Sequence, residues 1–123
     1  IKWRIIMVSA CYSGSFIETL KDPNTAIMTA ASAGRASFGC DDKRKLTYFG
    51  EVLLQNQLQE QFSFAAAFES AAREIELREQ AEKRDPSQPQ IHIGEAMQEK
   101  LLRIETRLRR DAGRETEVLI QDP

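Results

Sequence analysis

The feature that most constrains the fold is a short apolar run, Ile5–Val8, which ends a few residues before Cys11. A small polar turn that contains glycine, Ser13–Ser15, follows the cysteine. Short apolar runs that stop at a turn are typical of buried strands in parallel sheets. Reactive groups in such sheets collect outside the carboxyl ends of the strands. The sequence therefore predicts an α/β protein that carries Cys11 at the rim of its sheet.

A thiol in this position has two interpretations. Cysteine is among the most often buried residue types, so an inert core residue is the commoner one. The alternative is a nucleophile, which acts as the thiolate and needs a neighbour that favours the ionised form. We expect a short helix to open near Ser13–Ile17, and the free N–H groups of its first turn would favour negative charge beside Cys11.

Several further blocks follow at characteristic spacings. In order along the chain, the blocks are Met7–Ser15, Thr29–Ala31, Arg35, Ser37–Cys40, Lys43–Arg44 and Thr47–Glu51. Over about residues 2–55 they resemble the legumain-type cysteine peptidases, and several ordered blocks are more specific than one motif. The resemblance implies the caspase-like α/β fold, a mostly parallel sheet flanked by helices, present here only as its C-terminal part. The caspase signature has a different spacing between its cysteine and glycine, so the chain is not assigned to caspases proper.

The resemblance implies that Cys11 is the nucleophile of a cysteine endopeptidase. Residues 1–110 would be the C-terminal part of the peptidase domain, and 111–123 a mobile tail. In the family the general base is a histidine in a His-Gly pair on the preceding strand, and the glycine completes the oxyanion hole. The sole histidine, His92, matches no family block, and a partly buried or surface histidine is its simplest interpretation. We therefore expect a missing N-terminal segment to supply the base, and this chain alone to be inactive.

Three residues are expected to bind the peptide or protein substrate. The resemblance places Ser37 on the edge along which an extended peptide lies, and Glu51 at a carboxylate site in the primary pocket. Ser9 falls where plant and animal legumains have a glutamate, which puts their asparagine preference in doubt. If the Glu51 carboxylate were left unpaired, a basic side chain would satisfy it. The alternative is that Glu51 is an exposed glutamate in the first turn of a helix.

Other functions remain open from the sequence. A transamidase of the same family would use the same thioester and differ only in the acceptor. A catalytically inactive peptide-binding module, or pseudo-peptidase, would keep the groove without the chemistry. A flavodoxin-like domain that binds an anion at Ser13–Ser15 is a remote third, because no phosphate-loop spacing is present. No cofactor and no metal site is expected.

The composition limits the classes of partner that the protein can bind. The chain has 17 basic and 19 acidic residues, and the net charge of -2 argues against nucleic-acid binding. Two cysteines make no disulfide framework, and Cys40 is interpreted as a buried apolar residue. Because the chain starts at Ile1 inside an apparent strand, we expect that an N-terminal half was removed or lies in another chain.

The remaining pattern predicts alternating strands and helices. Strands are expected at Lys2–Ala10, Thr25–Ala31 and around His92, and helices from Tyr48 to about Gln61, from Phe64 to Arg84 and from Gly94 to about Arg110. Thr47 and Ser63 are expected to cap the first two of these helices. The apolar stripes on the helices indicate core or partner-helix faces, which leaves self-association through helices open.

Overall fold

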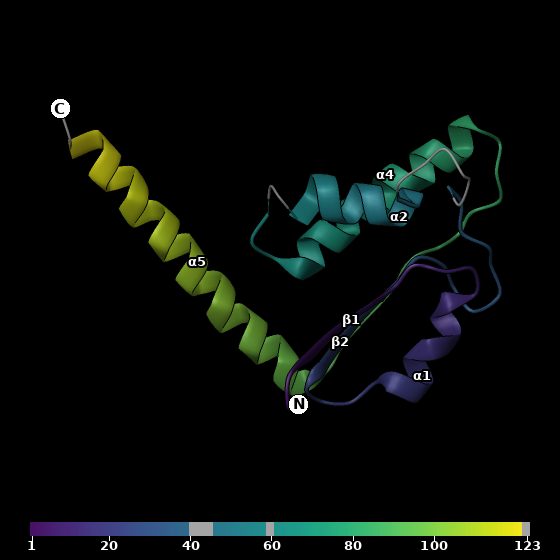
Figure 1. Ribbon diagram of the computed structural model, residues 1–123, viewed down its shortest axis with the longest axis horizontal. Coiled ribbons are helices and arrows are strands. Elements are labelled where there is room, and N and C mark those ends of the chain that lie inside the picture. Colours follow the sequence, from purple (N-terminus) through teal and green to yellow (C-terminus); the bar gives the residue numbers. More distant parts are fainter. Residues whose placement is uncertain (40–45, 59–60, 122–123) are drawn as a thin grey trace.

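The computed structural model describes residues 1–39, 46–58 and 61–121. The predicted role of Cys40 and the charged stretch 41–45 lie outside the described residues. The elements in order are β1 (Arg4–Val8), η1 (Ser13–Ser15), α1 (Phe16–Leu20), β2 (Thr25–Thr29), α2 (Tyr48–Gly50), η2 (Glu51–Gln57), α4 (Phe64–Ala81), β3 (Gln90–Ile93) and α5 (Glu95–Gln121). Helices lie on both sides of the strands (Figure 1), so the predicted α/β class is confirmed.

The three described strands form one sheet in the order β1-β2-β3. β1 pairs with β2 in parallel, with Ile6 opposite Ile27, and β3 joins the other side of β2 antiparallel, with His92 opposite Ile27. All five residues of β2 are buried, which fits its small and apolar sequence. β1 is more open, because it is an edge strand of the described sheet, and Ile5 is 45% exposed.

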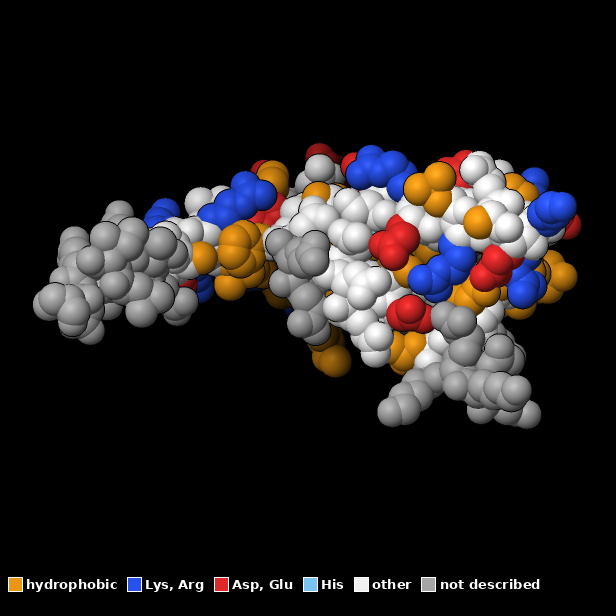
Figure 2. All heavy atoms as spheres, turned by 90° about the horizontal axis from the view of Figure 1, so that it is seen from above, with side chains coloured by type: hydrophobic (Ala, Val, Ile, Leu, Met, Phe, Trp, Pro, Cys, Tyr) orange, Lys and Arg blue, Asp and Glu red, His pale blue; other side chains and the backbone are white. Residues whose placement is uncertain are grey.

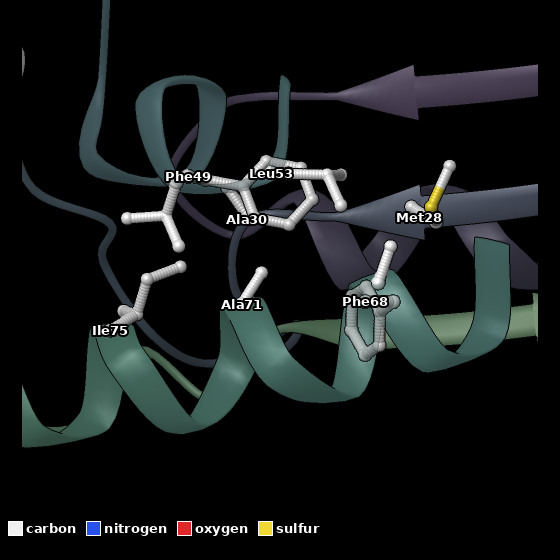
Figure 3. Packing of buried hydrophobic residues seen from close by; sticks show 9 residues of the cluster. Met28, Ala30, Phe49, Leu53, Phe68, Ala71 and Ile75 are labelled. Carbon is white, nitrogen blue, oxygen red and sulfur yellow. The ribbon is translucent and has the colours of Figure 1, made fainter. Parts of the chain in front are cut away.

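The main hydrophobic core lies between one face of the sheet and the helical segments α2, η2 and α4. Figure 3 shows Met28 and Ala30 from the β2 segment facing Phe68 and Ala71 of α4. The rings of Phe49 and Phe68 meet edge to face, with centroids 6.3 Å apart, a favourable arrangement for aromatic pairs. This packing fixes the position of the segment that carries Thr47 and Glu51.

The opposite face of the sheet is covered by α1 (Figure 1). The connection from β1 to β2 therefore crosses that face, as expected for neighbouring parallel strands. Ser13, which begins η1, is completely buried. Together, η1 and α1 confirm the expectation of a short helix shortly after Cys11.

The helix expected from Tyr48 differs from a regular α-helix. Three α-helical residues of α2 are followed by seven residues of π-helix in η2. The wider turns bring Phe49, Leu53 and Leu58, four and five residues apart, to the same core. The predicted caps are confirmed, because the Thr47 hydroxyl accepts a hydrogen bond from the Gly50 N–H and the Ser63 hydroxyl accepts one from the Ala66 N–H.

The last helix is longer than the sequence pattern predicts. Its first turns pack Met97 and Leu101 against Ala26 of β2 and the partly buried Trp3. Beyond these turns α5 runs away from the sheet (Figure 1) and continues to Gln121 rather than ending near Arg110. Residues 111–121 are therefore helical, and the mobility expected for the tail stays a prediction.

Charged side chains of both signs are interspersed on the surface. Seen from above, acidic and basic groups alternate rather than gather by sign (Figure 2). Within the described part of the chain, none of the helices is both long and apolar enough to cross a membrane.

Candidate active site

Cys11 lies just beyond the end of β1, and its thiol is free and exposed. The chain reverses at Tyr12, which has a left-handed backbone with φ 59°. For a residue other than glycine this conformation costs about 1–2 kcal/mol, so neighbouring contacts must hold it. One of these is the hydrogen bond from the Tyr12 N–H to the Arg35 carbonyl oxygen, at 2.8 Å.

The turn after Cys11 packs against the segment that follows β2, which holds it in place. The buried Ser13 hydroxyl accepts a hydrogen bond of 3.2 Å from the Ala31 N–H. Gly14 approaches the backbone so closely that an added Cβ would lie 2.7 Å from the Ala33 nitrogen. A glycine is therefore needed here, and the turn holds the thiol in a fixed place at the sheet rim, as predicted.

The thiol contacts Ser37, a residue expected to bind substrate. The Ser37 N–H donates to Cys11 Sγ at 3.3 Å, and Sγ lies 3.5 Å from the Ser37 carbonyl oxygen and 3.8 Å from the Ser37 hydroxyl. The backbone of Ser37 therefore fixes the position of the sulfur from one side, with its N–H as a donor and its carbonyl oxygen as an acceptor. The Cys11 N–H has no acceptor among the described residues, so it is available to an oxygen of a bound substrate.

Ser9 faces the helical segment rather than the thiol. Its hydroxyl lies 2.6 Å from the Thr47 hydroxyl, which also caps α2. The contact ties the segment between β1 and Cys11 to the start of α2. Ser37 thus contacts the thiol, whereas Ser9 contacts Thr47, and the roles of both serines in substrate binding stay predictions.

Glu51 lies one helical turn after Thr47, but its carboxylate is turned toward α4. An Arg78 nitrogen lies 3.6 Å from the Glu51 carboxylate, and the Arg78 guanidinium also covers the ring of Tyr48 at 4.8 Å. The premise of an unpaired Glu51 carboxylate is therefore wrong, and the argument for a basic substrate side chain loses its basis. The hydrogen bonds described for Ser9 and Ser37 run to Thr47 and Cys11 rather than to Glu51.

His92 is not positioned to assist Cys11. It lies on β3, and β2 separates it from β1 by two strand spacings, about 10 Å. The register places it level with Ile6, five residues before Cys11. His92 is half-buried and lines a hollow with Lys21 and Asp22, which agrees with a structural role.

A network that sequence reasoning missed supports the segment around Ser37. The Tyr48 hydroxyl donates to the Glu82 carboxylate at 2.7 Å and, together with Arg84, holds the pKa of Glu82 below its usual range. The guanidinium of Arg84 covers the Phe38 ring at 4.9 Å, and its pKa is raised by the same carboxylate. The charged residues at 82–84 could have indicated a polar network here, but the aromatic residues that they contact, Tyr48 and Phe38, are distant in sequence.

A buried carboxylate, also missed, anchors the loop between α4 and β3. Glu79 accepts hydrogen bonds from the Ser87 N–H at 2.9 Å and from the Ser87 hydroxyl at 3.1 Å. Burial raises the pKa of Glu79 despite these bonds. The Ser87 carbonyl accepts from the Ser32 N–H, so Glu79 connects this loop to the segment beside the turn that follows Cys11.

Comparison with known proteins identifies one family. The model of the peptidase C13 family matches residues 2–100. Neither a curated protein nor a solved structure matches the chain. Among the residues that the structure describes, no three metal-ligating side chains are grouped to hold an ion.

Proposed function

Since this chain belongs to the peptidase C13 family, the legumain family of cysteine peptidases, we propose that it hydrolyses peptide bonds with Cys11 as the nucleophile. The observation that carries the proposal is the exposed thiol fixed at the sheet rim and hydrogen-bonded by the backbone of Ser37. A structural cysteine would be expected in the core, where it packs as a small apolar side chain.

The reaction proceeds in two steps. The Cys11 sulfur, having given its proton to a base, attacks the carbonyl carbon of the peptide, and a C–S bond forms. The oxygen gains negative charge, for which the Cys11 N–H is one donor. The C–N bond then breaks, and the amine leaves with the proton returned by the base. Water next attacks the thioester, which releases the acid and restores the thiol.

The base is proposed to be an imidazole from a segment other than residues 1–123. His92 is the sole histidine here, and it lies on the wrong strand. β1 is an edge of the described sheet, so another strand can pair with it and bring a histidine beside Cys11. The chain alone is then inactive toward peptides, and the whole protein is active.

The substrate is proposed to lie extended along the segment that contains Ser37. The carbonyl of Phe38 accepts from the Tyr48 N–H, which holds this segment against the start of α2. The contact of Ser37 with the sulfur supports this proposal, because a peptide paired with this segment would lie next to Cys11. Ser37 thus contributes both to the orientation of the nucleophile and to the edge that binds the substrate, while Ser9 and Glu51 are proposed to act at the margins of the same site.

Covalent labelling tests the proposal. The whole protein is treated with a peptide that carries a thiol-reactive acyloxymethyl ketone, and the modified residue is identified by mass spectrometry. We expect label on Cys11, loss of labelling and of peptide cleavage in Cys11→Ser, and retention of both in the control Cys40→Ser. Equal labelling and cleavage by Cys11→Ser would refute the assignment.

Product analysis separates the related functions. Hydrolysis gives a free carboxylate, whereas transfer to an added amine, with little acid formed, would indicate a transamidase. Peptide binding without labelling of Cys11 or cleavage would indicate an inactive binding module. Either result would overturn the hydrolase proposal.

A further inference from the structure

We infer that the hollow beside Cys11, lined by Tyr12, Arg35 and Phe38, is a subsite for an acidic side chain of the peptide substrate. The inference rests on the proposed function, because the ligand is a peptide held in reach of the thiol.

The hollow has a volume of about 620 Å³, enough for a side chain and part of a peptide backbone. Tyr12, which also lines it, follows the nucleophile directly. Ala36 and Phe38 also line the hollow, and they flank Ser37, the residue that contacts the sulfur. Tyr12 and the two neighbours of Ser37 thus bring the wall of this hollow next to the thiol, and the inference takes a bound peptide to extend from the thiol into it.

Arg35 supplies the charge that recognises the ligand. A terminal nitrogen of its guanidinium donates to the Pro86 carbonyl at 3.2 Å, which anchors the side chain on the wall. Guanidinium has five N–H donors in a planar fork, so one bond to a carbonyl leaves donors for a carboxylate. In the described part of the chain, no carboxylate lies within ion-pair distance of Arg35.

The other groups around the hollow suit the same ligand. The rings of Tyr12 and Phe38 give apolar walls for the methylene groups of an aspartate or glutamate side chain. Asp85 also lines the hollow, but it is exposed to solvent, which screens its charge more than that of the half-buried Arg35. The balance favours an anion, and removal of the Asp85 charge should strengthen its binding.

The test compares peptides that differ only in a carboxylate or an amide at one side chain. In the whole protein with Cys11→Ala, which prevents turnover, the affinities of fluorescent peptides with a single Asp are compared with those of the same peptides carrying Asn at that place. We expect one position at which Asp binds about tenfold more tightly, the factor of a charge-assisted pair at a partly exposed site. The preference should weaken as the salt concentration rises.

Variants assign the preference to Arg35. Arg35→Gln should abolish it, Arg35→Lys should retain part of it, and Asp85→Asn should increase it two- to threefold. The matched control is Arg107→Gln, which removes an exposed arginine on α5 that does not line this hollow. Arg35→Lys keeps the test valid if the glutamine variant fails to fold.

The outcomes distinguish the two proposals. Absence of an Asp preference at every position, or an equal preference in Arg35→Gln, overturns the subsite. Because the binding assay needs no reaction, that result is independent of whether Cys11 is labelled and whether peptides are cleaved. Failure of labelling with an intact Asp preference would overturn the peptidase and leave the acidic subsite standing.

Discussion

Replacement of Glu79 by alanine should destabilise the fold, whereas replacement by glutamine should not. The Glu79 carboxylate is buried and accepts two hydrogen bonds from Ser87. Alanine removes both acceptors and leaves the Ser87 N–H buried without a partner. Glutamine has nearly the same shape, and its carbonyl oxygen still accepts from that N–H.

The magnitude follows from these contacts. A buried N–H that loses its acceptor costs about 1–3 kcal/mol, and the space left by the side chain adds about 1 kcal/mol. Relief of carboxylate burial offsets part of this loss, because burial disfavours the charged form and raises the pKa of Glu79. We expect Glu79→Ala to lower the free energy of unfolding by about 2 kcal/mol, and Glu79→Gln to change it by less than about 1 kcal/mol.

The pH dependence of stability shows whether the charge of Glu79 stabilises or destabilises the fold. A carboxyl group with a raised pKa in the folded state makes the fold less stable as pH rises from the ordinary glutamate range through that pKa. Measured relative to Glu79→Gln, the wild-type protein should therefore be more stable near pH 4.5, the ordinary glutamate value, than at pH 7. Groups with lowered pKa, such as Asp22, lose their contribution only as pH falls below the ordinary carboxyl range.

Urea unfolding followed by circular dichroism measures these free energies. The free energy of unfolding falls by about 1–3 kcal/mol per M of urea, so a loss of about 2 kcal/mol lowers the urea concentration at the midpoint by roughly 1 M. Glu69→Gln, an exposed change on the same helix, is the control and should leave the midpoint unchanged. Equal stability of the alanine and glutamine variants would refute the reasoning, since it would mean that the Ser87 N–H does not need the acceptor.

Three further predictions concern the site. Gly14→Ala forces a Cβ against the backbone of Ser32 and Ala33, so it should lower the free energy of unfolding by about 2 kcal/mol or more. It should also change the rate at which iodoacetamide alkylates Cys11. An unchanged alkylation rate and an unchanged urea midpoint would contradict the close approach of Gly14 to that backbone. Thr47→Val removes the cap of α2 and should cost about 1 kcal/mol in thermal unfolding, whereas Thr47→Ser should restore most of it. Tyr48→Phe removes a hydrogen bond to Glu82 and should move the pKa of that carboxyl upward in an NMR titration, and an unmoved pKa would exclude the bond.

Features encoded by neighbouring residues were predictable from the sequence. The apolar run Ile5–Val8 and the turn after it place Cys11 at the end of a strand, as the structure confirms. Thr47 and Ser63 cap the helices that they precede, because a cap needs only a hydroxyl before a helical pattern. These signals act within a few residues, so a single sequence carries them.

Features that depend on distant partners were not predictable in the same way. The pairing of Glu51 with Arg78 and the burial of Glu79 against Ser87 require the relative placement of η2, α4 and the following loop. Glutamate is usually exposed, so the sequence alone favours solvent for both acids. The switch from α2 to π-helical turns follows from core packing, which periodicity does not resolve.

The contact between Ser37 and Cys11 links two properties that an engineer would wish to vary separately. The peptide group that steadies the sulfur belongs to the same stretch of backbone whose side chains form the wall of the neighbouring hollow. A bulky replacement at Ala36 or Phe38 that reshapes the hollow also shifts this peptide group, and with it the sulfur. If the hollow selects a side chain as proposed, that selectivity is easier to alter from the loop at Asp85, which lies outside this stretch of backbone.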